Sequence, residues 1–250
     1  MNKPLNSLNN FLFMRTKGSK IANFSLLALV GMYAAILLYP NFLFAHTFTY
    51  QGFTIHSTQP IGDRILAVIT KAEQNLSGSE IYDNQRTHHI YLCNGYSLYA
   101  FLAPQSRKAF ACNYPLINNI FIANCSAEKN EAYKYNEDDQ YSRQLSALIS
   151  HEITHTFIEK RIGYWKFRTL SEWKNEGYCD YVGYGKKSSL NEIKSSFGSI
   201  KTDARPGTVY RKYYYAVSYL IDVEHMTFDQ IVSTPMSFDE VCDKIQRAGE

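Results

Sequence analysis

The chain has 250 residues, 45% of them hydrophobic and 15% aromatic, which is typical of a folded protein with a sizeable core and excludes disorder as the main state. Lys and Arg total 26 against 23 Asp and Glu, but four of the cations precede the first acidic residue. The rest of the chain is therefore nearly neutral and lacks the basic excess with which a nucleic-acid-binding protein neutralises the phosphates of its partner. We expect no nucleic acid among its partners.

An apolar run, residues 24–45, follows the N-terminal cations, and no charged residue stands between Lys20 and Asp63. About 20 apolar residues in a helix cover the hydrocarbon core of a bilayer. The run lacks the polar face of a core helix, so we predict a transmembrane anchor over 21–45. A cleaved signal peptide is the main alternative, although Leu43 is large for position −3 of a cut at the end of the run.

The cations on the N-terminal side predict the orientation of this anchor. By the positive-inside tendency the tail, 1–20, stays in the cytoplasm and 46–250 are extracytoplasmic, as in a single-pass membrane protein. Export would permit a disulfide among Cys93, Cys112 and Cys125, which fall within one short stretch. Small buried hydrophobic residues are an equally good interpretation of these cysteines.

Residues 46–135 predict an α/β lobe that mixes strands and helices. The segment 47–56 is rich in aromatic and β-branched residues and reads as paired strand, whereas apolar residues recur at helical spacing over 61–76. Three further apolar runs have the length of strands: 89–93, 109–112 and 119–123.

Residues 136–250 predict a mainly helical lobe. Asn136 offers a cap and Gly163 a stop for one long helix. The segments 227–230 and 237–240 have the spacing of capping boxes, in which the first and fourth side chains satisfy each other's backbone donors. The fold class that we expect is α+β, with a small mixed sheet lobe followed by helices.

The predicted long helix contains His151, Glu152 and His155 in an HExxH pattern. Histidines at i and i+4 lie one above the other on a helix, so both rings can ligate one Zn²⁺ while the glutamate stands beside the attacking water. Two core histidines bonded to protein groups are the alternative, but the buried Glu152 would then lack a cation. The pattern therefore predicts a site for one zinc ion.

Catalytic zinc usually takes three protein ligands, and Glu176 is the candidate for the third. It lies 21 residues after His155, in a segment where Leu170 and Ser171 predict the start of another helix. Glu172 is a weaker candidate, because it would lie in the first turn of that helix and lacks a following glycine.

HExxH followed by W-x-x-E-G-x-x-x-Y over 173–181 resembles the gluzincin zinc peptidases, the clan of thermolysin and aminopeptidase N. The resemblance covers roughly 119–221. It implies a zincin-like domain in which His151, His155 and Glu176 bind zinc and Glu152 is the general base. Cys179 departs from the clan, which usually has Ala there, and the chain is shorter than either named member.

The resemblance also implies three further roles. Asp180 would orient a zinc-bound histidine, Tyr210 would donate a hydrogen bond to the oxyanion, and a strand before the zinc helix would pair with substrate at the edge of the sheet. An exposed acid, a packing aromatic and an ordinary core strand are the respective alternatives. The strand in question comprises Asn119, Ile120, Phe121, Ile122 and Ala123.

The function predicted from these patterns is hydrolysis of peptide bonds by a membrane-anchored, extracytoplasmic zinc metallopeptidase. Its partners would be a peptide or protein substrate and, through 21–45, the membrane. The alternative is a non-catalytic binding or assembly domain that zinc stabilises on the membrane surface. Glu152 favours the enzyme, because a structural zinc site needs no base beside an open position. His88 and His89 alternate along a predicted strand and are expected to be structural.

Overall fold

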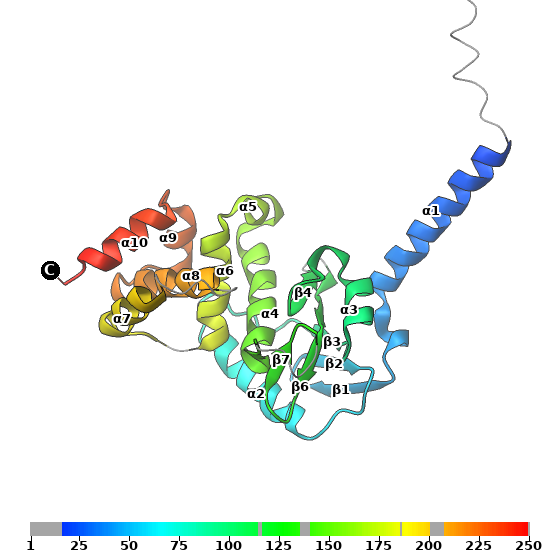
Figure 1. The fold of residues 1–250 in the computed structure, drawn as a ribbon, viewed down its shortest axis with the longest axis horizontal. Helices are drawn as coiled ribbons and strands as arrows, with labels where there is room; N and C mark the ends of the chain where they lie inside the picture. Colours follow the sequence, from blue (N-terminus) through cyan, green and yellow to red (C-terminus); the bar gives the residue numbers. More distant parts are fainter. Residues whose placement is uncertain (1–16, 115–116, 136–140, 186, 201–207, 250) are drawn as a thin grey trace, which may run out of the picture. The chain divides into compact units, whose positions relative to one another are not determined.

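The computed structural model describes residues 17–114, 117–135, 141–185, 187–200 and 208–249 (Figure 1). The chain divides into two compact units, the first ending at Leu43 and the second beginning at Phe44. The first unit contains helix α1 (Lys17–Leu38) and a short 3-10 turn, Pro40–Leu43.

The predicted transmembrane anchor over 21–45 is wrong. Among the described residues, no helix is long and apolar enough to cross a membrane. The apolar run is not one helix, because α1 ends at Leu38 and the separate 3-10 turn Pro40–Leu43 follows within the run. The helical part of the run, 24–38, is only about 22 Å long at 1.5 Å per residue, against a hydrocarbon core of about 30 Å. The predicted single-pass localisation rested on this anchor and is wrong with it.

The second unit has the predicted α+β fold, and its strands form a mixed five-stranded sheet in the order β1-β2-β3-β5-β4. Strands β2, β3 and β5 are parallel, whereas β1 and β4 are antiparallel to their neighbours. A second, antiparallel sheet has three short strands. The strands are β1 (His46–Tyr50), β2 (Phe53–Ser57), β3 (His88–Leu92), β4 (Ala111–Tyr114), β5 (Asn119–Ile122), β6 (Asn124–Ser126), β7 (Glu131–Tyr133) and β8 (Arg143–Gln144).

The segment 47–56, predicted as paired strand, forms a hairpin of β1 and β2. Gln51 and Gly52 have φ angles of 43° and 83°, so both central residues of the turn lie in the left-handed region that two-residue hairpins favour. The prediction of paired strand is confirmed. The aromatic and β-branched pattern did not predict the turn at Gln51 and Gly52.

Helices dominate the second half, as predicted. The predicted start of the long helix at Asn136, a residue outside the described ones, is wrong, because Arg143 and Gln144 pair with β7 in the small sheet and α4 begins only at Leu145. The predicted stop is confirmed: α4 ends at Ile162, and Gly163 follows it with a φ of 81° that suits glycine. Both predicted capping boxes, at Thr227 and Ser237, are confirmed. The helices are α2 (Arg64–Ser77), α3 (Tyr96–Leu102), α4 (Leu145–Ile162), α5 (Tyr164–Thr169), α6 (Glu172–Tyr184), α7 (Leu190–Ile200), α8 (Thr208–Ser218), α9 (Phe228–Ser233) and α10 (Phe238–Arg247), with a π turn over Tyr219–Val223 after α8.

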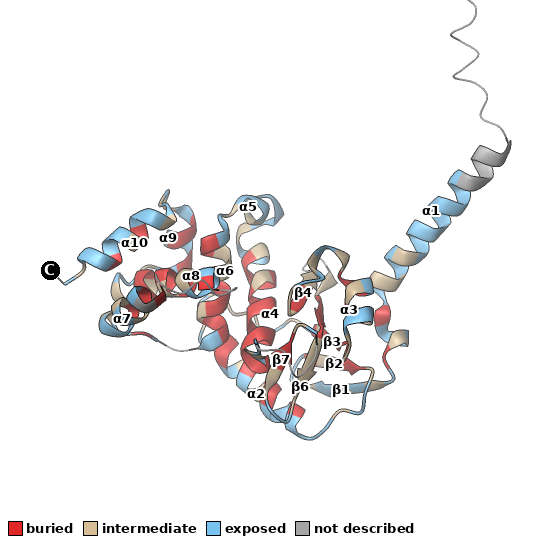
Figure 2. Cartoon of the chain, viewed as in Figure 1, coloured by how far each residue is buried: buried red, intermediate tan, exposed pale blue. Residues whose placement is uncertain are grey.

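Helix α4 runs between the sheet and the C-terminal helices (Figure 1), and most of its length is buried (Figure 2). One face of the sheet packs with α2 and α4 through aliphatic residues such as Ile55, Ile90 and Ile120. The opposite face carries stacked rings, including the pair Tyr91 and Phe121 at 5.0 Å between centroids. The core is therefore built around α4.

The histidines of β3 lie on opposite faces, as expected. His88 meets Phe157 of α4 edge to face, at 5.7 Å between ring centroids, whereas His89 lies near His56 of β2. All five cysteines are free thiols, so the disulfide considered among Cys93, Cys112 and Cys125 is not formed.

Glycines on α6 set how closely its two neighbouring helices approach. A Cβ at Gly177 would lie 2.5 Å from the backbone oxygen of Tyr213 on α8, and one at Gly183 would lie 2.8 Å from the backbone oxygen of Ala147 on α4. Backbone atoms cannot move aside as a flexible side chain can. Helix α6 is therefore in close backbone contact with both α4 and α8.

Gly177→Ala should lower the free energy of unfolding by about 1–3 kcal/mol, because the added methyl group forces α6 and α8 apart. Urea denaturation followed by circular dichroism measures this change. Gly198→Ala is the matched control: it is also a helical glycine, but a Cβ there has nothing within 4 Å. The control should be neutral or slightly stabilising, and equal losses in both variants would contradict the close contact at Gly177.

Candidate metal centre

The candidate site lies on the buried face of α4. His151 is 3% exposed and Glu152 8% exposed, while His155 is half-buried. The hydroxyl groups of Ser150 and Thr154 donate to backbone carbonyls: Ser150 to Ala72 of α2 and Thr154 to Ser150 of the same helix. The imidazole rings depend on partners from other elements.

The predicted third residue, Glu176, comes from α6 and meets both rings. Its carboxylate oxygens lie 3.3 Å from Nε2 of His151 and 3.6 Å from Nε2 of His155. The two rings are perpendicular, with 4.9 Å between their centroids. The structure thus brings together the three residues that the sequence predicts as ligands.

The other nitrogen of His151 is held by Asp180. Nδ1 lies 2.7 Å from Oδ1 of Asp180, and the same oxygen accepts from Arg143 at 2.5 Å. Asp180 is only 3% exposed, so the alternative of an exposed helix acid is excluded. Burial alone would raise the pKa of Asp180, but Arg143 and His151 lower it to about 2. A permanent carboxylate therefore fixes the orientation of the His151 ring.

The other nitrogen of His155 has two neighbours on α6. Nδ1 lies 3.2 Å from Oδ1 of Asn175 and 3.2 Å from Sγ of Cys179. The sequence analysis missed Asn175, although its i,i+4 spacing to Cys179 puts both on one face of the helix, just as Glu176 and Asp180 share another. Burial and nearby carboxylates raise the pKa of the Cys179 thiol well above its usual value, so this sulfur keeps its proton.

Donor atoms suitable for a metal converge here. His151, His155 and Cys179 could hold a metal ion, because each offers one ligand atom and these atoms all lie within 4.8 Å of one another. Glu176 adds a carboxylate beside both Nε2 atoms. Imidazole, thiolate and carboxylate groups are all ligands of divalent transition metals.

Without a cation, the charges at the site are balanced by a proton on His151. Burial disfavours the charged ring, but Asp180 and Glu176 outweigh it and raise the pKa of His151 to about 10. Glu176 changes in the opposite sense, because His155 and His151 outweigh its burial and lower its pKa to about 2. The site is therefore built to hold positive charge between carboxylates.

Glu152 is held in place through its own backbone. The side-chain amide of Asn113, on strand β4, donates to the carbonyl oxygen of Glu152 and to Oγ1 of Thr156, the latter at 3.1 Å. No ion pair to the Glu152 carboxylate is found in the part of the chain that the structure describes. The sequence analysis did not single out Asn113, because a contact between an edge strand and a helix has no sequence signal.

The predicted edge strand is not at the edge. Strand β5, with Asn119, Ile120, Phe121, Ile122 and the following Ala123, lies between β3 and β4, and all five residues are buried. Its apolar character on both faces suits an interior strand. The strand at this edge of the sheet is β4, which also contacts α4.

Tyr210 lies on α8, and its hydroxyl contacts Glu172 of α6 instead of a predicted metal ligand. Its hydroxyl donates to Oε1 of Glu172 at 3.5 Å, and it is 37% exposed. Burial raises the pKa of Tyr210, and the charges of Glu176 and Glu172 raise it further, so the hydroxyl faces the acidic side of α6. Glu172 itself is exposed, which disfavours it as a metal ligand.

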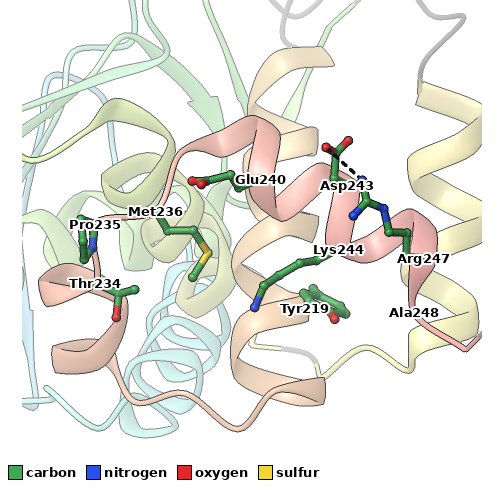
Figure 3. A pocket seen from close by; sticks show the side chains of 9 residues that line it. All are labelled: Tyr219, Thr234, Pro235, Met236, Glu240, Asp243, Lys244, Arg247 and Ala248. Atoms are coloured by element: carbon green, nitrogen blue, oxygen red, sulfur yellow. Dashed lines mark ion pairs between the residues drawn. The ribbon is translucent and has the colours of Figure 1, made fainter.

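A surface groove of about 610 Å³ lies away from this site, on the C-terminal helices (Figure 3). Its charged side chains already have partners: Lys244 pairs with Glu224, Arg247 pairs with Asp243, and Glu240 caps the start of α10. It contains none of the predicted site residues. The residues that line it are Tyr219, Thr234, Pro235, Met236, Glu240, Asp243, Lys244, Arg247 and Ala248.

None of the protein-family models matches this sequence, and no curated protein matches it either.

Metal binding should release about one proton, because His151 must lose the proton it carries at neutral pH before its ring can ligate. Affinity should accordingly rise about tenfold per pH unit between roughly pH 6 and 8, well below the raised pKa. Titration calorimetry in two buffers of different ionisation enthalpy counts the protons. Asp180→Asn removes the main source of the raised pKa and should reduce the count, whereas a wild-type count of zero would mean a neutral His151.

Proposed function

We propose that this protein is a zinc-dependent peptidase in which His151, His155 and Glu176 bind one Zn²⁺ and Glu152 acts as general base. The positions of the Nε2 atoms support the proposal most directly. Both face the Glu176 carboxylate, at 3.3 and 3.6 Å, while both Nδ1 atoms contact other groups of α6. Two histidines and a glutamate leave a fourth position open, as in catalytic zinc sites.

Cys179 is a weaker third ligand than Glu176. Its sulfur lies beside Nδ1 of His155, on the side of the ring opposite Nε2, and it keeps its proton among carboxylates. A glutamate with a pKa of about 2 needs no deprotonation before it binds a cation. We therefore assign Cys179, with Asn175, to holding the His155 ring.

The resemblance of HExxH and W-x-x-E-G to the gluzincin peptidases favours the same assignment. A zinc ion at these residues would supply a Lewis acid that polarises the scissile carbonyl and lowers the pKa of a water molecule. Glu152 would take the proton of the attacking water and deliver it to the amide nitrogen as the C–N bond breaks. Asp180 and Arg143 would keep the His151 ring oriented.

Two further groups suit a peptide substrate. Within the described residues β4 pairs only with β5, so the backbone groups on its other edge could pair with an extended peptide. This strand lies close to Glu152, because Asn113 of β4 donates a hydrogen bond to the Glu152 carbonyl. The Tyr210 hydroxyl would have to leave Glu172 before it could donate to the oxyanion that forms on the carbonyl. A non-catalytic zinc domain would need neither feature, and it would not need the buried Glu152, which has no ion pair among the described residues.

The ligand set can be tested by metal content. Glu176→Ala should lose most of the bound zinc, since a lost ligand removes a bond to the metal, whereas Glu172→Ala should keep it. Asp180→Asn should fall between them, at roughly a 10- to 100-fold loss of affinity. Elemental analysis and competition with a chromogenic chelator measure both. If Cys179→Ser costs as much affinity as Glu176→Ala, the sulfur is a ligand and the assignment is wrong.

Glu152→Gln should keep stoichiometric zinc and lose about 10²- to 10⁴-fold in kcat, because it removes the general base but no ligand. A peptide-library assay read by mass spectrometry, together with zinc analysis, measures both properties. Glu159→Gln, two turns further along the same helix, is the control and should change neither. Zinc bound at one equivalent with no cleavage of any library member by the wild type would favour the non-catalytic domain.

A further inference from the structure

A stretch of nine residues beside the metal centre combines cations with aromatic rings. Residues 160–168, which we call the basic–aromatic segment, read KRIGYWKFR and include four cations and no acid. They form the end of α4, the turn at Gly163 and most of α5. The proposed peptidase activity uses none of these side chains.

The rings of this segment point in different directions. Phe167 is half-buried and meets the His155 ring edge to face, at 6.2 Å between centroids. Trp165 is 81% exposed, the largest exposed fraction of the large apolar side chains in the described part of the chain. Tyr164 is 44% exposed and packs on the Trp165 ring at 5.3 Å. Phe167 thus fixes α5 to the core, while an aromatic pair projects into solvent.

The cations around this pair are only half neutralised. Lys160 pairs with Asp83 and Arg161 with Asp229. Lys166 and Arg168 are both exposed, and neither has an ion pair among the residues that the structure describes. Arg161 and, to a smaller extent, Lys166 lower the pKa of Asp229, so this one carboxylate serves two cations and positive charge remains in excess around the exposed aromatic pair.

We propose that the basic–aromatic segment docks on an anionic lipid surface, with Trp165 in the headgroup layer and Lys166 and Arg168 against lipid phosphates. Indole and phenol rings prefer the boundary between water and hydrocarbon, where the ring is buried and its polar atom stays hydrated. Cations beside them add attraction to acidic headgroups. The exposed aromatic pair favours this partner over a soluble polyanion, which needs charge alone. The proposed contact is with the surface of the bilayer.

The two tryptophans of the chain give this proposal a local reporter. Trp173 is 6% exposed and packs near Phe238, so Trp173→Phe leaves Trp165 as the sole tryptophan, which is excited selectively at the red edge of the absorption band. On addition of vesicles containing roughly a third phosphatidylglycerol in phosphatidylcholine, the emission of Trp165 should shift to the blue and lose quenching by acrylamide. Pure phosphatidylcholine vesicles should give a much smaller change, and salt at about 0.5 M should weaken the effect.

Charge reversal separates docking at this segment from binding elsewhere on the chain. The double variant Lys166→Glu with Arg168→Glu, made in the single-tryptophan protein, should need at least about ten times more anionic lipid to reach half of the emission change. The matched control reverses Lys187, an exposed cation beyond α6, and should have no such effect. If Trp173→Phe fails to fold, the difference between wild type and Trp165→Phe gives the same reading.

Two results would overturn the proposal. In the first, the protein sediments with anionic vesicles while Trp165 keeps its emission and its access to acrylamide, which would place the lipid contact elsewhere. In the second, heparin or single-stranded DNA shifts the Trp165 emission and vesicles do not, which would assign the segment to a soluble polyanion. Neither result bears on peptidase activity, so this proposal and the proposed function can fail separately.

Discussion

The buried ring of His151 and the half-buried ring of His155 on α4 must find polar partners, and within the described residues α6 supplies the hydrogen-bonding groups that meet them. A buried polar group without a hydrogen bond costs about 1–3 kcal/mol, and a buried charge without a counter-charge costs more. Asp180 and Glu176 meet the ring of His151, while Asn175 and Cys179 meet that of His155. The close packing of α6 against α4 follows from this requirement, and Gly183 makes it sterically feasible.

The same requirement explains the charge distribution around the centre. Arg143 compensates Asp180, which would otherwise stand as a second buried anion beside Glu176. With Arg143 in place, the remaining negative charge faces the Nε2 atoms, where a proton or a metal ion can balance it. The centre thus favours a cation beside the two Nε2 atoms and Glu176, while the Asp180 carboxylate stays on the Nδ1 side of the His151 ring.

Much of the site was predictable from local spacing. HExxH is a short-range pattern on one helix, and Glu176 and Asp180 share a face of the next, so helical geometry alone relates them. What spacing cannot give is contact between distant elements. Asn113 reaches Glu152 only because β4 packs on α4, and Arg143 reaches Asp180 from the residues before α4.

The sheet and the N-terminal segment show the same limit. An apolar strand such as β5 reads alike at an edge or in the interior, because its neighbours are fixed by tertiary pairing. The apolar run 24–45 was interpreted by its length, but helix α1 ends within it, and Phe44 belongs to the core of the second unit. Hydropathy measures how apolar a segment is, and it does not locate the residue at which a helix ends.

The close backbone contact of α6 has a consequence for how the centre responds to strain. Four side chains on one helix, Asn175, Glu176, Cys179 and Asp180, hold both histidines, and an α-helix moves nearly as a rigid rod over such a short distance. A displacement of α6 from α4 therefore loosens these four polar partners of the two rings at once, and the centre is lost or retained as a whole. A ligand that bridges the two helices would in turn clamp the sheet side of the core to the C-terminal helices.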